Sequence, residues 1–584
     1  MAKKTSDKRK QQQRQATIQI IIVAGILVCL NILAARFHKG LDLTKEKRFT
    51  LSNATKRLLK NLDETVVVEV YLKGKFPAGF QRLSEATRER LQSFREYSGN
   101  HLVYRFVDPF EGLDEIDKGK MTEQLYKKGV EPMALNVKGK QNSSEQIIFP
   151  YALIRYKGKE TAVKLLENRF GMMPLEVLNY SESLLEYKLA TAIHQLEFPV
   201  KPTIGYIVGH GEAFGMHTYD MMHVLGQHYE VDTVYLPEEY HLSEKKYSAI
   251  IINKPTEPFD EKDKFKIDQY IMRGGKVLWA IDQLNTPVDT LQRTGQFITT
   301  EYGLNLDDQL FKYGVRINYN LIEDAQQCNP IPLITGTLSN GQPQIELRPW
   351  TFLPFFTPIS KHPIVHNMDA IMGRFVNSID TIANANTTKT ILLEASNYSR
   401  TPSSPVRVSL SMLRFDPDLR LYNKPQNKSI AAAVLVEGTF NSLYQNRIAP
   451  TFLHTLKDSL KIPFKGATDS INSMIVLSDG DFFMNGISER TGPQEMGYWE
   501  YTGSLFSNKN FLLNCLEYLT DPNSLLEARS KDLRLRLLDP KRAQDERTKW
   551  QFVNVGVPIA LILVFASAYM FFRKRKYETP LQKK

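Results

Sequence analysis

Four polar residues follow two short apolar runs, in positions where a sheet would bring them to one side. Gly209-His210-Gly211-Glu212 comes directly after Thr203–Val208, and Asp479 and Asp481 come after Ser473–Ser478. Such runs are typical of strands buried on both faces. In a doubly wound α/β sheet, ligands bind at the carboxyl ends of the strands. The sequence therefore predicts a candidate binding cleft that is formed by Gly209, His210, Gly211, Glu212, Asp479 and Asp481.

The histidine loop could carry an acid–base pair or a metal ion. His217, His223 and His228 follow His210, but no two of these histidines have the i, i+4 spacing of a metalloprotease helix, and no cysteine lies among them. We therefore predict no metal site. We favour a tight turn in which glycines let the chain reverse while His210 and Glu212 hydrogen-bond to neighbouring loops.

The second acidic loop has an equally simple interpretation. Calcium and magnesium need more oxygen ligands than Asp479 and Asp481 supply, so Asp-Gly turn chemistry is preferred. If the sheet is doubly wound, this loop and the His210 loop open on the same edge and face one cleft.

Motifs for catalysis are missing from this sequence. It contains no GxxxxGK[ST] phosphate loop, no GxSxG elbow and no GxGxxG dinucleotide motif. We therefore predict a protein that is not an enzyme, with no catalytic residue and no cofactor. Two alternatives stay open: a hydrolase that uses His210, Glu212, Asp479 and Asp481, or a scaffold whose own side chains fill the cleft.

Around these loops, strands alternate with helices of about a dozen residues, which favours parallel pairing. We predict an α/β domain over 199–524, similar to a doubly wound fold. Its expected strands are Tyr229–Leu236, Ser248–Asn253, Lys276–Asp282, Val315–Glu323, Thr390–Glu394 and Ala431–Glu437, and its expected helices are Met216–Gly226, Asp260–Met272, Gln296–Leu304 and Asn510–Thr520.

A proline-rich stretch interrupts this domain. Asn329–Pro363 holds seven prolines, which fix φ and remove ladder donors, so we expect irregular or edge-strand structure in an insertion around 329–430. The anchors of this insertion would be Trp350, Phe352, Phe355 and Phe356. We favour burial of these aromatic side chains, and the alternative is that they face a partner.

An earlier α/β domain is expected over 36–198. Ser52 is a candidate N-cap for a helix over Asn53–Leu62. The remaining order is β-α-β-α-β-β-α, which is that of a thioredoxin-like fold, but Lys73-Gly74-Lys75-Phe76 stands where redox enzymes carry cysteines. Its expected elements are Thr65–Leu72, Leu83–Tyr97, His101–Val107, Met121–Lys128, Pro132–Val137, Gln146–Tyr156, Glu160–Leu165 and Leu175–Leu196.

The net charge of +11 is concentrated at the two ends of the chain. Residues 1–16 and 573–584 each carry a net +5, which leaves +1 for everything between. These tails flank two uncharged apolar runs, Thr17–Ala35 and Phe552–Phe572, each long enough to cross a bilayer. This is a membrane pattern rather than a nucleic-acid-binding one. For the first run we favour an uncleaved anchor over a signal peptide, because no good cleavage site follows it.

Basic residues prefer the cytoplasmic side, so both termini are expected there. Residues 36–551 would then lie outside, in the periplasm of a Gram-negative cell, with 525–551 as a stalk helix before the second span. Cys328 and Cys515 could pair, but a large domain does not need a disulfide.

Several short motifs, in this order and between two terminal spans, resemble one family. They are Leu41-Asp42-Leu43-Thr44, Arg48-Phe49-Thr50-Leu51-Ser52, Tyr71-Leu72-Lys73-Gly74-Lys75-Phe76-Pro77, Gly209-His210-Gly211-Glu212, His362-Pro363-Ile364, Ser478-Asp479-Gly480-Asp481-Phe482 and Arg536-Leu537-Leu538-Asp539 followed by Trp550. The chain resembles the auxiliary, substrate-binding-type (GldG-like) protein of the gliding-motility ABC transporter of Bacteroidota.

The resemblance implies a central domain similar to class I glutamine amidotransferases but without the cysteine nucleophile. It also implies a separate permease and a separate ATPase as partners in the inner membrane. We therefore expect a non-enzymatic auxiliary subunit whose periplasmic domain binds a ligand or an envelope partner in support of gliding motility.

Overall fold

A computed structural model describes most of the chain. The described residues are 17–18, 21–26, 28–29, 50–74, 76–138, 143–167, 174–198, 200–337, 339–422, 429–448, 454–459, 461–521, 525–530 and 546–577. The chain divides into two compact units, 1–532 and 533–584, which we describe separately. Residues 19–20, 27 and 30–35 of the predicted first span lie outside the described residues, as do the basic tail 1–16, part of the second basic tail (578–584) and 531–545.

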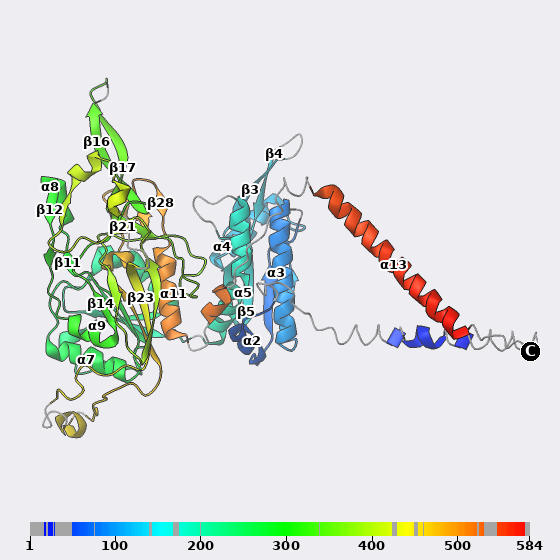
Figure 1. The fold of residues 1–584 in the computed structure, drawn as a ribbon, viewed down its shortest axis with the longest axis horizontal. Coiled ribbons are helices and arrows are strands. Elements are labelled where there is room, and N and C mark those ends of the chain that lie inside the picture. Colours follow the sequence, from blue (N-terminus) through cyan, green and yellow to red (C-terminus); the bar gives the residue numbers. More distant parts are fainter. Residues whose placement is uncertain are drawn as a thin grey trace, which may run out of the picture. The chain divides into compact units, whose positions relative to one another are not determined.

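The first part of unit 1 is built on a four-stranded mixed sheet with the order β2-β1-β5-β6 (Figure 1). β1 is parallel to β2 and antiparallel to β5, and β6 is antiparallel to β5. The elements of this part are α2 (Asn53–Lys60), β1 (Val66–Val70), α3 (Ala78–Tyr97), β2 (Leu102–Phe106), α4 (Glu115–Lys127), β3 (Met133–Lys138), β4 (Ser143–Ile148), β5 (Tyr151–Tyr156), β6 (Lys159–Lys164) and α5 (Pro174–Glu197).

Helix α2 begins where the sequence predicted. The Ser52 hydroxyl accepts a hydrogen bond from the Thr55 backbone N–H at 3.1 Å, which caps the helix. The Ser52 backbone N–H donates to the Glu186 carboxylate on α5 at 2.6 Å, and Arg90 of α3 pairs with the same carboxylate. A buried glutamate thus ties the start of α2 to α3 and α5.

One predicted strand is two strands in the structure. Gln146–Tyr156 was expected to be continuous, but β4 ends at Ile148 and β5 begins at Tyr151. Pro150 lies between them and has no N–H for a ladder. The chain changes partner there, since β4 pairs with β3 whereas β5 pairs with β1 and β6.

The second part of unit 1 contains a nine-stranded sheet. Its order is β14-β19-β23-β24-β10-β9-β7-β8, and β20 also pairs with β23. The five strands from β24 to β8 are parallel, as predicted, whereas β14, β19, β20 and β23 pair antiparallel. Its strands are β7 (Thr203–Val208), β8 (Glu230–Tyr235), β9 (Ala249–Asn253), β10 (Val277–Ala280), β14 (Val315–Ile317), β19 (Ile379–Thr381), β20 (Thr387–Glu394), β23 (Ala431–Gly438) and β24 (Asn472–Leu477).

Both faces of this sheet are buried, because alternate residues of a strand enter two separate cores. Ile251 of β9 packs in the core that holds residues of α6 and α11, and its neighbours Ile250 and Ile252 pack in the core that holds residues of α7 and α9. Figure 1 shows α11 on one side of the strands and α7 with α9 on the other. These helices are α6 (Tyr219–His228), α7 (Glu261–Met272), α9 (Asp307–Tyr313) and α11 (Asn508–Thr520).

The helix predicted over Gln296–Leu304 is wrong. This segment forms β12 (Gln296–Ile298) and β13 (Thr300–Glu301), and the helix is the preceding α8 (Val288–Thr294), which Gly295 ends in a left-handed conformation. Phe297, Ile298 and the threonines that follow are β-branched or aromatic and favour strands. Val315–Glu323 is likewise not one strand, because only β14 and the short β15 (Glu323–Asp324) are extended.

The proline-rich stretch is more regular than expected. It forms a long antiparallel pair of strands, β16 (Cys328–Thr337) and β17 (Pro343–Phe356), in which Pro330 pairs with Pro349. The end of β17 also pairs with β18 (Ile371–Met372), which makes a three-stranded sheet. β18 pairs only with Phe355 and Phe356 among the described residues, so the rest of β17 and the outer side of β16 are edges. Prolines are tolerated on edges because no partner needs their missing N–H.

The predicted anchors are buried. Trp350, Phe352 and Phe356 are at most 5% exposed and Phe355 is half-buried. The favoured interpretation is thus confirmed for these side chains.

Short elements complete the second part. They are η1 (Gly215–Thr218), η2 (Leu236–Glu238), β11 (Leu284–Asn285), β18 (Ile371–Met372), β21 (Ser399–Arg400), β22 (Arg407–Ser409), η3 (Leu410–Arg414), η4 (Leu419–Tyr422), η5 (Thr455–Ser459), η6 (Gly480–Phe483), β25 (Ile487–Ser488), β26 (Gly492–Pro493), β27 (Tyr498–Trp499) and β28 (Ser504–Leu505). Cys328 and Cys515 are both free thiols, and Cys515 lies on the buried face of α11.

The first residues of the predicted stalk are not a stalk. Leu525–Ser530 form the 3-10 helix η7, in which Leu525 and Leu526 are almost fully buried. Leu525 belongs to the core of the first part, so apolar side chains hold this segment against α5.

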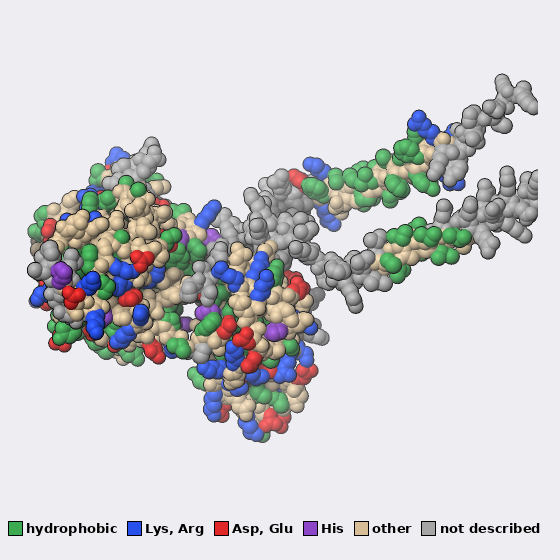
Figure 2. Space-filling view, turned by 90° about the horizontal axis from the view of Figure 1, so that it is seen from below, with side chains coloured by type: hydrophobic (Ala, Val, Ile, Leu, Met, Phe, Trp, Pro, Cys, Tyr) green, Lys and Arg blue, Asp and Glu red, His purple; other side chains and the backbone are tan. Residues whose placement is uncertain are grey.

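Unit 2 is described over 546–577. It contains α13 (Arg547–Tyr577), within which Arg547–Arg575 is apolar and long enough to cross a membrane. Hydrophobic side chains cover this helix between basic residues at its ends (Figure 2). The second predicted span, Phe552–Phe572, lies inside it.

Candidate functional site

The carboxyl ends of the parallel strands form one edge of the large sheet, which we call the carboxyl edge. Four loops begin there, after β7, β9, β10 and β24. They carry His210 and Glu212, Lys254, Asp282, and Asp479 with Asp481. The antiparallel strand β23 starts at this same edge, since Ala433 pairs with Leu477. This is the edge at which an open α/β sheet places a ligand site.

His210 lies in a closed cluster. Its Nε2 atom lies 3.0 Å from Asp263 Oδ2 of α7, and its Nδ1 atom lies 3.5 Å from Glu212 Oε1. The ring stacks on Phe259 with centroids 3.8 Å apart, and only 4% of the residue is exposed. Lys266 pairs with the other oxygen of Asp263. Carboxylates lie at both nitrogens of the imidazole and the Phe259 ring covers one face. His210 therefore connects its own loop to helix α7.

These carboxylates change the protonation of His210. Burial by itself would lower the pKa of His210, but the hydrogen bond and charge of Glu212, together with the charge of Asp263, outweigh it. The pKa of His210 is therefore raised above its ordinary value, which favours the imidazolium.

Two glycines permit the turn that carries His210. Gly209 has φ 127° and a Cβ there would lie 2.5 Å from Pro237 Cδ. Gly211 has φ 72° and a Cβ would lie 2.1 Å from Thr256 Oγ1. The His210 carbonyl accepts hydrogen bonds from the backbone N–H groups of Thr256 and Glu257. The turn thus needs glycine at both positions, because Gly209 lies against the segment after β8 and Gly211 lies against the loop after β9.

A second cluster surrounds Lys254. Its ammonium lies 2.7 Å from Asp481 Oδ2 and 3.2 Å from Asp282 Oδ2. Asp479 is fully buried and accepts hydrogen bonds from the backbone N–H groups of Arg374 and Asp481. Oxygens of the three carboxylates lie within 4.8 Å of one another, so the geometry could suit a cation. The lysine ammonium already supplies a cation to this group.

Burial dominates the electrostatics of this cluster. Burial and the charges of Asp481 and Asp282 raise the pKa of Asp479 well above its ordinary value, against the opposing effect of Lys254. Burial also raises the pKa of Asp282, again opposed by Lys254. The pKa of Lys254 is raised, because its three carboxylates outweigh its own burial. The cluster therefore keeps the ammonium charged and favours a proton on a carboxyl group.

Sequence reasoning found part of this arrangement and missed part of it. It singled out Asp479 and Asp481 but not Lys254 or Asp282. The signal was available: Lys254 is the first charged residue after the apolar β9, and Asp282 is the first after β10. A charge directly after a buried parallel strand lies at the carboxyl edge.

The structure brings the two predicted loops to one edge but not into contact. Both lie against the loop after β9, which His210 meets through Thr256 and Gly480 meets through Lys254. Among the described residues, no hydrogen bond or ion pair joins His210 or Glu212 to Asp479 or Asp481.

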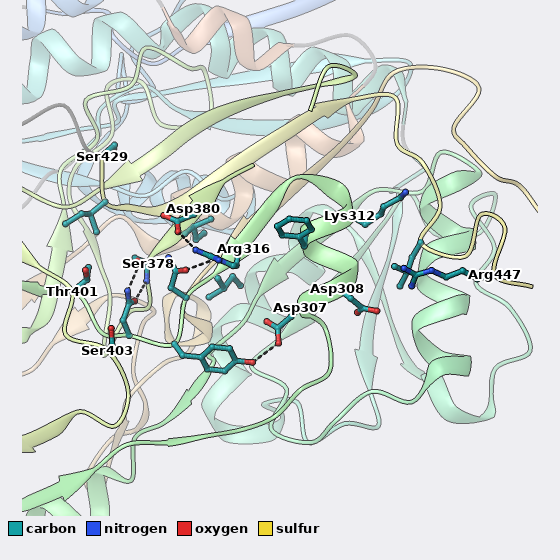
Figure 3. A pocket seen from close by; sticks show the side chains of 18 residues that line it. Asp307, Asp308, Lys312, Arg316, Ser378, Asp380, Thr401, Ser403, Ser429 and Arg447 are labelled. Atoms are coloured by element: carbon teal, nitrogen blue, oxygen red, sulfur yellow. Dashed lines mark hydrogen bonds and ion pairs between the residues drawn. The ribbon is translucent and has the colours of Figure 1, made fainter. Parts of the chain in front are cut away.

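An open pocket of about 1040 Å³ lies further along the carboxyl edge (Figure 3). It is formed by the end of β14, the starts of β19 and β23, α9, and the segment after β23 that carries Leu443 and Arg447. The residues predicted for the cleft do not line it. Its charged lining residues are Asp307, Asp308, Lys312, Arg316, Asp380 and Arg447.

A hydrogen bond links this pocket to the residue next to the Lys254 cluster. The Gln283 side chain, next to Asp282, donates to Asp307 Oδ1 at 3.1 Å. The Tyr319 hydroxyl donates to the other oxygen of Asp307 at 2.7 Å. The buried cluster therefore supports one wall of the open pocket.

A second pocket of about 450 Å³ lies at the opposite edge of the sheet. It is lined by residues before β7 and β8, such as Lys201 and His228, and by residues of α5 and α11, such as His194 and Leu513. Burial lowers the pKa of both histidines. A lowered pKa favours the neutral imidazole, which is compatible with the apolar surroundings of this pocket between the two parts of unit 1.

The fold is thus a mixed α/β architecture with charged loops at one sheet edge and an apolar helix in a separate unit. Residues 201–515 match the family model of an ABC-type uncharacterized transport system, which is more than half of the chain. The chain belongs to this family of ABC transporter auxiliary components. Residues 45–155 match a second model, a domain of unknown function (DUF7088).

Individual relatives are distant. An uncharacterized protein of Borreliella burgdorferi is 22% identical over 570 residues, covering 96% of this chain and 97% of the relative. Among solved structures, the mmIFT52 N-terminal domain matches at 12% identity and a TM-score of 0.30, covering 55% of this chain and 97% of that one. The exo-β-1,4-mannosidase Op5Man5 of an Opitutaceae bacterium matches at 13% identity and a TM-score of 0.12, covering 52% and 49%.

The family indicates the general role of the protein. The chain is an auxiliary component of a transport system and works with transporter components. Together with the apolar helix α13, this indicates association with a membrane.

Proposed function

We propose that this protein is a non-enzymatic, membrane-anchored subunit of an ABC transporter, and that it presents a large binding domain outside the cytoplasm. The family match over 201–515 carries the proposal. The sequence has no phosphate-binding loop, so a separate ATPase would supply the energy and a separate permease the path.

The proposed topology has two spans. Thr17–Ala35 and Phe552–Phe572 would both cross the inner membrane and leave both basic tails in the cytoplasm. The body, 36–551, would then be periplasmic. The apolar α13 supports the second span. Reporter fusions to the C-terminus would test it, because a cytoplasmic end gives a fluorescent protein signal and no alkaline phosphatase activity.

The proposed fold assignments follow the strand orders. The order β2-β1-β5-β6, with one parallel and two antiparallel pairings, supports a thioredoxin-like first domain. The five parallel strands around β7 support an amidotransferase-like second domain that lacks the cysteine nucleophile. In such a domain the carboxyl edge would bind the ligand or envelope partner, and the loops of Gly209–Glu212 and Asp479–Asp481 would form part of it.

The proposed biological process is gliding motility. It rests on the motif resemblance alone, and deletion of the gene followed by a surface-spreading assay tests it. Normal spreading by the deletion strain would remove this part of the proposal and leave the transporter role.

The transporter role is tested by purification of the tagged full-length chain from its own cells in mild detergent. We expect a permease and an ATPase to co-purify, with ATP hydrolysis in the purified complex. A matched variant replaces 552–572 with an unrelated apolar helix of equal length, which keeps an anchor but removes specific helix contacts. A chain that is recovered alone under these conditions contradicts the proposal.

A further inference from the structure

The pocket beside β14 has carboxylates that are already satisfied by the protein. Asp308 accepts from the buried Lys264 ammonium at 2.8 Å, and Asp380 pairs with Arg316 at 2.9 Å. Asp307 accepts from Tyr319 and Gln283. The acidic side chains of this pocket are therefore committed to neighbours.

Two cationic side chains of the same pocket have no ion-pair partner among the described residues. Lys312 on α9 and Arg447 are both exposed, and neither makes an ion pair with any residue in the described part of the chain. Figure 3 shows them at the same end of the pocket. Arginine presents a planar set of donors that matches carboxylate and phosphate groups, and lysine adds a compact charge.

The opposite end of the pocket is polar and neutral. Thr401 and Ser403 lie there, with hydroxyls that make no side-chain hydrogen bond to other described residues (Figure 3). The Ser378 hydroxyl accepts from the side chains of Asn318 and Asn320 at 3.0 and 2.9 Å, which fixes this wall. Phe311, which is 51% exposed, adds an apolar surface to the lining.

We propose that this pocket binds a small anion, whose carboxylate or phosphate group contacts Lys312 and Arg447. The uncommitted charges of the lining are positive and the carboxylates are occupied, so the pocket complements an anion rather than a metal cation. The volume of about 1040 Å³ is at the upper end of the range for small-molecule sites. The remaining hydroxyls would bind polar groups on the body of the ligand.

The physiological meaning of this site rests on the proposed function, in which the domain outside the cytoplasm binds a ligand for the transporter. The binding measurement does not depend on the proposed function, because it uses the purified chain without a permease or ATPase. A failed co-purification and a failed binding measurement are therefore separate results.

Isothermal titration of the full-length chain in detergent tests the proposal with inorganic phosphate in one arm and succinate in the other. We expect saturable binding of at least one probe, which identifies the anion class. Lys312→Gln with Arg447→Gln should weaken it at least about tenfold, because each lost charged contact removes a substantial part of the binding energy. Added sodium chloride should weaken it as well.

The matched control is Lys361→Gln, an exposed lysine that does not line the pocket. It should bind the probe as the unchanged chain does. Thermal unfolding of each variant confirms that the exposed substitutions leave the fold intact. Absence of saturable binding in both arms, or equal binding by the double variant, overturns the proposal.

Discussion

The carboxyl edge of the large sheet carries charge in two different ways. His210 is buried and Lys254 is largely buried, and each of them contacts two carboxylates. In the pocket beside β14, Lys312 and Arg447 are exposed and, among described residues, have no carboxylate partner. The same edge thus contains charges that hold the fold together and charges that are available to a ligand.

This difference shows that charged residues near a strand end can have two roles, one in stability and one in ligand binding. A buried charge must be paired, because an isolated ion in a protein interior is strongly unfavourable. An exposed cation is hydrated by water, so it can remain without an ion-pair partner until an anion binds. Burial and pairing therefore decide which charged residues serve structure and which serve binding.

The largest contrast should come from removing one lysine of each kind. Lys254→Met leaves Asp282, Asp479 and Asp481 without their cation, and we expect a loss of about 3–5 kcal/mol in the free energy of unfolding. Lys312→Met should change it by less than about 0.5 kcal/mol. Urea unfolding of the full chain measures both, and equal effects would contradict the distinction.

A smaller effect should follow from crowding the buried cluster. A Cβ on Gly480 would lie 2.4 Å from Lys254 Cβ and 2.9 Å from its Cα, so Gly480→Ala forces a backbone shift that costs about 1–3 kcal/mol. Gly466→Ala is the matched control, since the nearest atom to its Cβ would be 3.8 Å away. Similar unfolding midpoints for the two variants would show that the loop after β24 adapts freely.

A pH-dependent effect should identify the His210 cluster. Because the folded-state pKa of His210 is raised, the stabilisation by its imidazolium is complete below the unfolded value of about 6.5 and is lost as the pH rises through the folded value. His210→Gln should therefore lose more stability at pH 6 than at pH 8.5, as measured by urea unfolding.

The control for this experiment is His241→Gln, since His241 is exposed on the loop before β9. It should show no comparable change between the two pH values. A His210→Gln defect that is the same at both pH values would mean that packing against Phe259, rather than charge, is what the histidine supplies.

The smallest effect on stability should come from the pocket cations. Lys312→Gln with Arg447→Gln removes two exposed charges that have no ion-pair partner among described residues, so the free energy of unfolding should change by less than about 0.5 kcal/mol. Calorimetry of the full chain measures this. A larger loss would place these residues with the structural group and weaken the comparison.

Much of the fold could be predicted from local sequence patterns. β7 was predicted with its observed bounds, and the start of α2 was predicted from Ser52, whose side chain caps that helix. The helix α7 was predicted to begin at Asp260, which is its N-cap in the structure. These features depend on residues within a few positions of one another. Gln296–Leu304 was predicted wrongly because its strands are set by distant partners, such as β22 for β12.

The candidate site was harder to predict, for the same reason. Gly209–Glu212 and Asp479–Asp481 were recognised because each follows an apolar run. The side chains that pair with them were not recognised. Asp263, the partner of His210, and Lys254, the partner of Asp481, both lie far along the chain from those residues.

The sequence by itself determined the apolar runs, the basic tails, the caps, the glycine turn and the missing nucleotide loop, because each is a property of neighbouring residues. Only the tertiary structure decided that His210 and Asp479 are buried in paired clusters and that Lys312 and Arg447 share an open pocket. Burial and pairing arise when strands far apart in the chain are brought side by side, as β23 and β14 are through β19.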